Sequence, residues 1–496
     1  MTAEDTAIHD EDAQHLASLG YSYDATFKRE MTFWGNVSLG FTYLSPIAGV
    51  YSMFAISLGT AGPPMAWAML IALAGQFFVA LVFGEVVSNY PVSGGVYPWS
   101  RRLWGRKWAW MNGWIYVVAL VGTLAAVAYG AAPFVASMFG MVLDSWGTVL
   151  IGLLALVIAT VLNFSGTKVL NLAALVGLIA EMIGAVGIGI YLLLFGRQHD
   201  WSVLFDNQGI GNDAPGGYFG AFAAAALIGM FAYYGFEANG DVAEEIKDPG
   251  RQVPKAMRVT LYIGGFAANL MVFSLVLAVP DFGKIASGEV TDPIGELLHQ
   301  AFGPIFPLVM AIIVVAFISC ITSLQAAASR LVYSMARDGF LPASHLAASF
   351  NKKLHVPHVA LISVAVVPAA ILVLSLLLED ALTAMVGFGT VGIYMGFQMV
   401  VLAALRARIL GWQPAGKFKL GVWAYPVNLI ALLWGVLAIA NILWPRETGG
   451  GWAEDYLLLM TTAGVLLFGY TYMMVTRSYR RGDAPAGDAS GPIKLP

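Results

Sequence analysis

Three acidic residues interrupt apolar stretches of this sequence, and their side chains are the best placed to do chemistry. Glu181 lies in the apolar run 178–184, and Glu237 and Asp241 lie near the end of the run 218–241. A carboxylate is costly to keep charged in apolar surroundings, so such an acid exchanges a proton or faces a cation. We predict that Glu181 and Glu237 couple the protein's activity to protons, or that Glu181 is the counter-charge of a cation. The alternative for both is a structural acid that bonds freed backbone, and Asp241 is expected to bond a polar neighbour.

These acids are exceptions in a chain that is poor in charge. Of its 496 residues, 58% are hydrophobic and 11% are charged, whereas about a quarter are charged in a typical soluble protein. Its 26 basic and 30 acidic residues are too few to coat soluble domains of this total length. The composition therefore excludes a soluble enzyme and a disordered chain, and the net charge of −4 argues against a nucleic-acid partner. With one cysteine and seven scattered histidines, we expect no disulfide, no metal site and no cofactor.

The apolar residues gather in twelve segments, each near the length of about 20 residues that crosses a bilayer as a helix. The segments are 33–59, 65–89, 110–139, 147–165, 171–195, 218–241, 257–280, 304–330, 357–378, 382–405, 420–444 and 456–476. The sequence therefore predicts an all-α integral membrane protein with twelve transmembrane helices. With both termini in the cytoplasm, every Lys and Arg except Arg197, Lys284 and Arg446 falls on the cytoplasmic side. We expect a protein of the plasma membrane, embedded in the lipid bilayer, with both termini cytoplasmic.

Two of the segments contain residues that break a helix. The first holds Pro46 and Gly49, and the sixth holds Gly235. Proline removes a backbone donor and clashes with the preceding turn, and glycine permits unwinding at little steric cost. Because the breaks are five segments apart, they predict a five-plus-five inverted-repeat fold with helices 1 and 6 broken. The alternative for each break is a plain kink.

The predicted organisation of the chain follows from these breaks. Residues 1–30 form a cytoplasmic N-terminal tail, 31–196 form the first repeat and 216–406 form the second repeat. Residues 418–478 hold the last two helices, and 479–496 form a cytoplasmic C-terminal tail.

Three runs near the ends of these segments carry a family likeness. They are GEVVSNYPVSGGVY at 84–97, GFE at 235–237 followed by AEEIKDPGRQVPKA at 243–256, and SRLVYSMARDG at 329–339. In this order and between these segments, they resemble the amino acid–polyamine–organocation superfamily of transporters, and within it the amino acid/choline branch. The resemblance covers about residues 31–480. It implies the five-plus-five fold and a substrate that binds at the two broken helices.

The resemblance also implies which residues bind the substrate. Free N–H groups of Ala48, Gly49 and Val50 suit a carboxylate, and carbonyls before the break and near Phe231 suit an ammonium group. The expected site comprises Ser45, Ile47, Ala48, Gly49, Val50, Thr123, Phe231, Ala232, Tyr233, Gly235, Phe236, Glu237, Ser319 and Tyr394. Phe231 stands where the family often has an aromatic gate. Many relatives have Gly-x-Gly at the first break, and Ile47-Ala48-Gly49 keeps only the second glycine. That narrows the space for an ordinary α-amino acid and leaves room for a compact ω-amino acid or an amine.

Glu181 falls where several relatives that do not need sodium carry a Lys in place of the sodium ion, so the sign of the charge is reversed here. Other polar residues have two readings. Ser319 and its neighbours either complete a sodium site or bond to the carbonyl four residues back. Thr123 and Tyr394 either bind substrate or hold helices together.

The prediction for function is a secondary active transporter that works by alternating access. Its cargo would be a small amine-bearing molecule: an amino acid, a compound like γ-aminobutyrate, a choline-like cation or a polyamine. We expect coupling to protons rather than sodium, because acids populate the segments. An exchanger of the same fold is the alternative, and a channel is a second one. No Gly-x-x-x-x-Gly-Lys run followed by Ser or Thr is present to indicate an ATP-driven pump, and the oligomeric state stays open.

Overall fold

A computed structural model of the protein describes residues 27, 29–290, 292–351, 353–377, 381–446, 451–482 and 484–490. The predicted N-terminal tail lies outside the described residues except at 27, 29 and 30, and so do residues 491–496 of the C-terminal tail. Within the described residues the regular structure is helical, with two isolated β-bridges at Met31–Ile246 and Asn351–Val356. The prediction of an all-α protein is confirmed.

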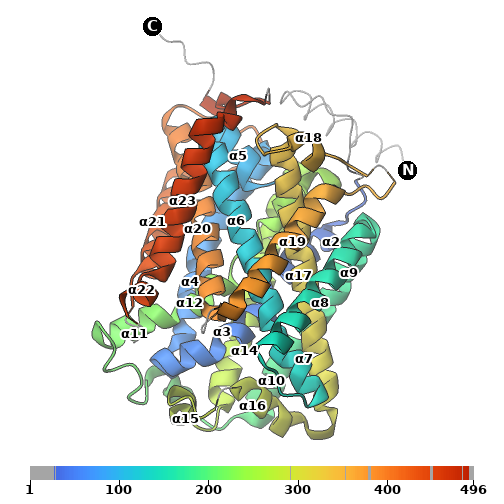
Figure 1. Ribbon diagram of the computed structural model, residues 1–496. Helices are drawn as coiled ribbons and strands as arrows, with labels where there is room; N and C mark the ends of the chain where they lie inside the picture. Colours follow the sequence, from blue (N-terminus) through green and yellow to red (C-terminus); the bar gives the residue numbers. More distant parts are fainter. Residues whose placement is uncertain are drawn as a thin grey trace.

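The described residues of the first half of the chain form ten α-helices, which run in Figure 1 from blue to green. They are α2 (Phe33–Leu44), α3 (Pro46–Ala61), α4 (Ala66–Asn89), α5 (Val96–Leu103), α6 (Arg106–Gly130), α7 (Ala132–Phe139), α8 (Ser145–Phe164), α9 (Thr167–Glu181), α10 (Ile188–Tyr191) and α11 (Gly217–Ala225). A π-helical turn over Met182–Gly187 joins α9 to α10, so this stretch is one long span.

The second half continues the bundle in green, yellow, orange and red. Its helices are α12 (Leu227–Ala232), α13 (Ala238–Asp241), α14 (Pro249–Ala278), α15 (Phe282–Ala286), α16 (Pro293–Phe302), α17 (Phe306–Arg337), α18 (Ser344–Ala347), α19 (His358–Leu374), α20 (Ala381–Ile409), α21 (Ala424–Leu443), α22 (Trp452–Asp455) and α23 (Leu457–Thr476).

Eleven helical stretches of the described residues are long and apolar enough to cross a membrane. They correspond to eleven of the twelve predicted segments. The exception is 218–241, where the apolar helical stretch is only Gly217–Ala232. Helical backbone stops at Ala232 and resumes at Ala238, so no single helix there has the length of a span. The twelfth crossing therefore stays a prediction.

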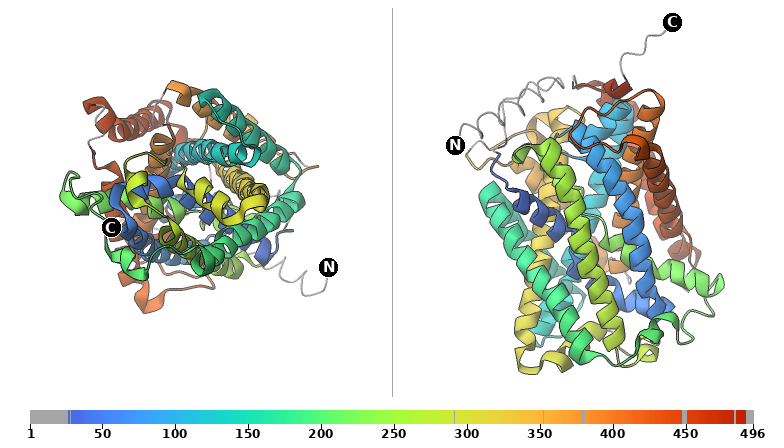
Figure 2. Two further views of the ribbon diagram at one scale, coloured as in Figure 1. Left: turned by 90° about the horizontal axis from the view of Figure 1, so that it is seen from below. Right: turned by 180° about the vertical axis from the view of Figure 1, so that it is seen from behind.

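The long helices lie side by side in one bundle, as the two views of Figure 2 show. Within an apolar 18-residue window of the spans Phe33–Ala61 and Arg106–Phe139, 83% of the residues are buried, whereas the corresponding share in Leu457–Thr476 is 17%. Outer helices expose large apolar side chains, such as Leu154 on α8, Leu433 on α21 and Leu467 on α23. A soluble protein would not expose so many, and acyl chains would cover them in a membrane. The fold is that of an integral membrane protein.

The two ends of the bundle differ in their short helices. α5 lies at one end, and α15 and α16 lie at the other (Figure 1). At the α5 end, the C-terminal segment docks on the chain: the Gly487 N–H donates to the Arg101 carbonyl at 2.8 Å, and Arg102 pairs with Asp488 at 3.1 Å. At the corner between α5 and α6, Trp104 and Trp108 stack with ring centroids 4.0 Å apart, and the Arg406 guanidinium of α20 lies 4.8 Å from the Trp104 ring.

Candidate functional site

The first span is interrupted at Ser45, between α2 and α3. Ser45 has a φ of 42°, which is unusual for a residue other than glycine, and Pro46 begins the next helix. The Ser45 side chain caps that helix, because its Oγ accepts from the Ala48 N–H at 3.0 Å. The Gly49 N–H donates to the Ser45 carbonyl at 2.9 Å. The amides of Ala48, Gly49 and Val50 were expected to bind a substrate carboxylate. Two of them, those of Ala48 and Gly49, are already hydrogen-bonded within the chain.

The sixth segment is interrupted over residues 233–237, between α12 and α13. Gly235 has a φ of 112°, which an L-residue rarely adopts. The two interruptions touch: a β-carbon placed on Gly235 would lie 2.4 Å from the Leu44 nitrogen. Likewise, a β-carbon on Gly49 would lie 3.0 Å from the Ala232 Cα. Glycine at both positions lets the backbones of the two segments come together in the bundle.

Glu181, at the end of α9, reaches the first interruption with both carboxylate oxygens. Its Oε1 accepts from the Ser45 hydroxyl, and its Oε2 accepts from the Ile47 N–H at 3.1 Å. The Glu181 side chain is fully buried. A negative carboxylate at the first turn of α3 also lies favourably in the field of that helix. Glu181 thus tethers the fifth span to the start of α3.

The Glu237 carboxylate accepts a hydrogen bond from the backbone of the second interruption, residues 233–237. Its Oε2 accepts from the Gly235 N–H at 2.7 Å, and its Oε1 accepts from the Tyr116 hydroxyl of α6 at 2.7 Å. Both Glu237 and Tyr116 are fully buried. This carboxylate therefore satisfies a backbone donor freed by the break and ties it to the third span.

Three aromatic rings meet beside the two interruptions. Tyr43 and Tyr234 pack edge to face with centroids 6.2 Å apart, and Phe231 meets Tyr234 in the same way at 5.6 Å. The hydroxyls of Tyr43 and Tyr234 are buried, and among the described residues neither has a hydrogen-bond partner. A buried hydroxyl without a partner is costly, so these two groups are suited to receive a polar ligand.

The remaining predicted residues are buried, but several point away from this place. The Tyr233 hydroxyl accepts from Asn269 of α14 at 2.7 Å, and the Ser319 hydroxyl donates to the Ala173 carbonyl of α9 at 3.4 Å. The Phe236 ring lies between Phe83 and Phe397. Tyr394 stacks near Phe397 and reaches Trp434 of α21 at 6.4 Å. Ile47, Val50, Thr123 and Ala232 are buried, and the Thr123 hydroxyl has no partner in the described part of the chain.

Asp241 differs from the expectation that it bonds a polar neighbour. It is fully buried, yet neither carboxylate oxygen has a hydrogen-bond partner among the described residues. The nearby Arg330 pairs with Glu245 at 3.0 Å. The carboxylate instead faces backbone: a β-carbon on Gly95 would lie 2.2 Å from its Oδ1.

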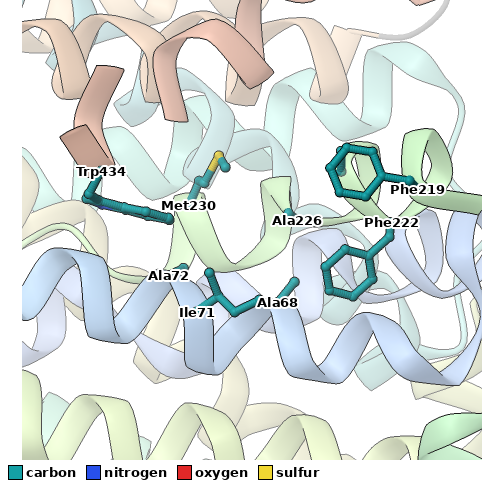
Figure 3. Close-up of a pocket in the computed structure, with 9 residues that line it drawn as sticks. Ala68, Ile71, Ala72, Phe219, Phe222, Ala226, Met230 and Trp434 are labelled. Carbon is teal, nitrogen blue, oxygen red and sulfur yellow. The ribbon is translucent and has the colours of Figure 1, made fainter. Parts of the chain in front are cut away.

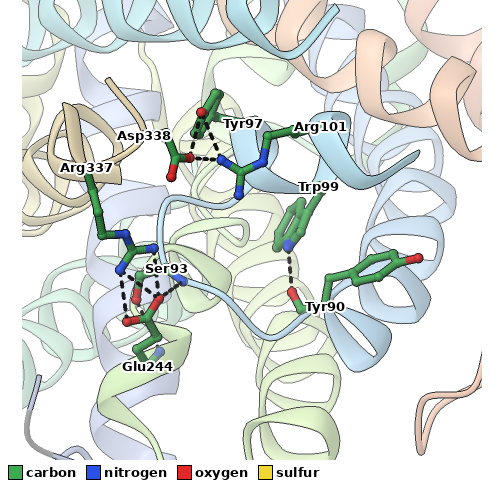
Figure 4. Close-up of polar contacts among 8 residues, drawn as sticks. All are labelled: Tyr90, Ser93, Tyr97, Trp99, Arg101, Glu244, Arg337 and Asp338. Atoms are coloured by element: carbon green, nitrogen blue, oxygen red, sulfur yellow. Dashed lines mark hydrogen bonds and ion pairs between the residues drawn. The ribbon is translucent and has the colours of Figure 1, made fainter. Parts of the chain in front are cut away.

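A cluster of ion pairs surrounds this end of the sixth segment. Figure 4 shows Glu244 between Arg337 and the Ser93 amide, with Arg101, Tyr97 and Asp338 grouped beside it. The cluster joins the loop before α5, the end of α17 and the segment after α13. It holds three parts of the chain together at one end of the bundle.

An apolar pocket of about 140 Å³ lies between α4, α11, α12 and α21. Figure 3 shows Ala68, Ile71, Phe219, Met230 and Trp434 around it. It offers no acid or base, so the polar groups at the two interruptions form the better candidate site.

The sequence reasoning missed Tyr43 and Tyr116 as site residues. Each is a tyrosine inside an apolar segment, where a buried hydroxyl needs a partner, and that signal could have found them. The presence of a tyrosine in an apolar segment does not show which face of the helix its side chain occupies.

The fold and the site define a helical membrane protein in which the interruption at Ser45 meets the interruption at 233–237 beside buried acids. A family model described as amino acid permease matches residues 33–468, and the chain belongs to this family of transporters, which are not enzymes. The match also confirms the superfamily that the sequence motifs indicated, while the branch within it stays a prediction.

Individual relatives cover most of the chain at low identity. The amino-acid permease BAT1 of Arabidopsis thaliana is 25% identical over 464 residues, which are 86% of this chain and 87% of that protein. Amino-acid permease 2 of Neurospora crassa is 25% identical over 456 residues, 87% of this chain and 81% of its own. A Macrophomina phaseolina protein named as an amino acid/polyamine transporter is 24% identical over 427 residues, 82% of this chain and 93% of its own.

Proposed function

We propose that the protein is a secondary active transporter that moves a small amine-bearing molecule by alternating access and couples this movement to protons. The observation that carries the proposal is Glu181, a buried acid bonded to the start of α3 where the first span is interrupted. Membership of the amino acid permease family supports transport as the activity. An amine-bearing cargo is supported by relatives that are named as an amino acid/polyamine transporter and an amino-acid permease.

The proposed architecture has twelve spans, with repeats at 31–196 and 216–406 and two further spans at 418–478. The order of elements supports it. In each half, an interrupted span is followed by a long helix and then by short helices, α5 in the first half and α15–α16 in the second. These short helices lie at opposite ends of the bundle (Figure 1), as two repeats of inverted orientation require.

We place both termini in the cytoplasm and the protein in the plasma membrane. The first and last described parts of the chain support a shared side: the Met31 N–H donates to the Glu245 carbonyl, and Gly487 bonds Arg101. Arg330 and Arg337 lie at this same end, and basic residues gather on the cytoplasmic side of membrane proteins.

In the proposed mechanism, Glu181 controls the tether between α9 and α3. The charged carboxylate accepts from Ser45 and Ile47, whereas a protonated carboxyl is a weaker acceptor at both. Protonation therefore loosens the start of α3, and deprotonation holds it. Glu237 is proposed as a second proton site at the other interruption, and the predicted residues of spans one, three, six, eight and ten are proposed to line the path.

Uptake by the purified protein in liposomes tests this proposal. A panel of amines and amino acids is offered with an inward proton gradient, an inward sodium gradient or neither. We expect the proton gradient to drive accumulation, and Glu181→Gln to remove that response. Glu454→Gln, which changes an exposed acid on α22, is the matched control and should respond like the wild type.

Two outcomes would contradict parts of the proposal. A full response of Glu181→Gln to the proton gradient would remove the coupling role of Glu181. Counterflow separates the alternatives. Uptake that requires substrate on the opposite side of the membrane indicates an exchanger. Flux that neither saturates nor is stimulated by substrate on the opposite side indicates a channel.

A further inference from the structure

The amides that open α3 leave little for a substrate carboxylate to bind. Pro46 has no N–H, the Ile47 N–H donates to Glu181, and the N–H groups of Ala48 and Gly49 donate to Ser45. A substrate carboxylate would have to displace the chain's own carboxylate. When Glu181 is deprotonated, the substrate carboxylate would also stand beside a second negative charge, and like charges in close contact repel each other strongly.

The charges around the interruptions are also one-sided. Glu181, Glu237 and Asp241 are each fully buried, and within the described residues none of them forms an ion pair. The arginines buried in the described chain are all paired with other carboxylates: Arg101 with Asp338, Arg102 with Asp488, Arg330 with Glu245 and Arg408 with Glu85. The unpaired acids make this region attractive to a cation and repulsive to an anion.

The aromatic rings offer what a cation needs. Tyr43, Tyr234 and Phe231 pack edge to face beside the interruptions, and the face of an aromatic ring attracts an ammonium group. The unpartnered hydroxyls of Tyr43 and Tyr234 can accept hydrogen bonds from ammonium N–H groups. Acceptors and aromatic rings gather at the interruptions, whereas the backbone N–H groups of Ile47, Ala48 and Gly49, which a carboxylate would need, are already bonded within the chain.

We infer that the cargo is a cationic amine without a carboxylate next to its nitrogen, such as an alkyl monoamine or diamine, rather than an α-amino acid. This inference rests on the proposed transport function and narrows its substrate class. Glu181 takes the place that a substrate carboxylate would need, and it supplies negative charge to the cargo.

Matched pairs that differ only by the carboxylate test the inference: ornithine against putrescine, lysine against cadaverine, and arginine against agmatine. In wild-type liposomes, we expect initial uptake of each amine to exceed that of its parent amino acid by at least about tenfold. Glu181→Gln should narrow this ratio, because it removes the repelling charge, and Glu454→Gln should leave it unchanged. Equal or faster uptake of the parent amino acids by the wild type would overturn the inference.

A binding measurement separates this inference from transport itself. The thermal unfolding of the detergent-purified protein is followed with each member of each pair. Stabilisation by the amine but not by its parent supports the cargo class even if no compound is taken up, an outcome that would remove the transport proposal alone. Stabilisation by the amino acids, or by neither member of any pair, would overturn the inference.

Discussion

Glu237 shows how one buried acid serves the backbone and the neighbouring helix at once. The break at Gly235 frees an amide inside the bundle, and the carboxylate accepts from it while also accepting from Tyr116. Buried polar groups are stable only when their hydrogen bonds are satisfied. The sequence predicted an acid at this break but not its partner, because no pattern in one sequence says which tyrosine of the third span faces the sixth.

Removal of the Tyr116 hydroxyl tests this bond. Tyr116→Phe leaves one oxygen of the buried Glu237 carboxylate without its donor, which should cost about 1–3 kcal/mol. We expect a lower melting temperature of the purified protein. Tyr470→Phe, at an exposed position on α23, is the control and should melt like the wild type. Identical melting of Tyr116→Phe and the control would contradict the bond.

Asp241 is the residue for which the sequence-based expectation failed. A carboxylate that has no partner in the described chain and no exposure is costly in its charged form. Asp241→Asn removes the charge while keeping the shape, so we expect a melting temperature equal to or above that of the wild type at neutral pH. Asp200→Asn, at a highly exposed side chain, provides the baseline. A clear loss of stability in Asp241→Asn alone would show that the charge is needed.

At the scale of elements, the sequence indicated where helical backbone stops, while the broken spans of an inverted repeat stay a prediction. Pro46 and Gly235 mark the two interruptions in the sequence, and α3 begins at Pro46 while Gly235 lies between α12 and α13. The left-handed conformation of Ser45 was not predictable, since serine rarely adopts it. Its cause is tertiary: the Ser45 side chain caps α3 and also donates to Glu181, which is 136 positions away.

The contact between the interruptions depends on the missing side chain of Gly235. A methyl group there would meet the backbone of Leu44, and the φ of 112° would be strained for alanine. We expect Gly235→Ala to abolish uptake and to lower the melting temperature. Gly464→Ala on α23, where a methyl group meets nothing within 4 Å, should change neither. Wild-type uptake by Gly235→Ala would show that the two segments need not touch.

For the whole molecule, composition and segment length predicted a helical membrane bundle, and the structure confirms this class. The number of crossings was harder, because the sixth segment is not one continuous helix. The sequence also could not predict which charged residues form ion pairs with one another. Ion pairs such as Glu85 with Arg408 join residues 323 positions apart, and only the assembled bundle brings them together.

The proposed orientation of the whole bundle can be tested with single cysteines. The native Cys320 is buried and should stay silent toward an impermeant maleimide. The side chains of Arg197 and Lys417 are 42% and 55% exposed, and they are predicted to lie on opposite sides of the membrane. Each is replaced by cysteine in a separate variant, Arg197→Cys and Lys417→Cys. In intact cells we expect labelling at 197 and none at 417, with both labelled after permeabilisation. The reverse pattern would invert the orientation.

The stacked indoles of Trp104 and Trp108 give this molecule an optical property. Two rings 4.0 Å apart with nearly parallel planes couple their electronic transitions, and Arg406 lies over one of them from α20. A shift of α20 against α6 would alter that coupling and, with it, the near-ultraviolet circular dichroism spectrum. The corner between α5 and α6 is therefore a native spectroscopic probe, one that reports on the movement of two helices without any attached dye.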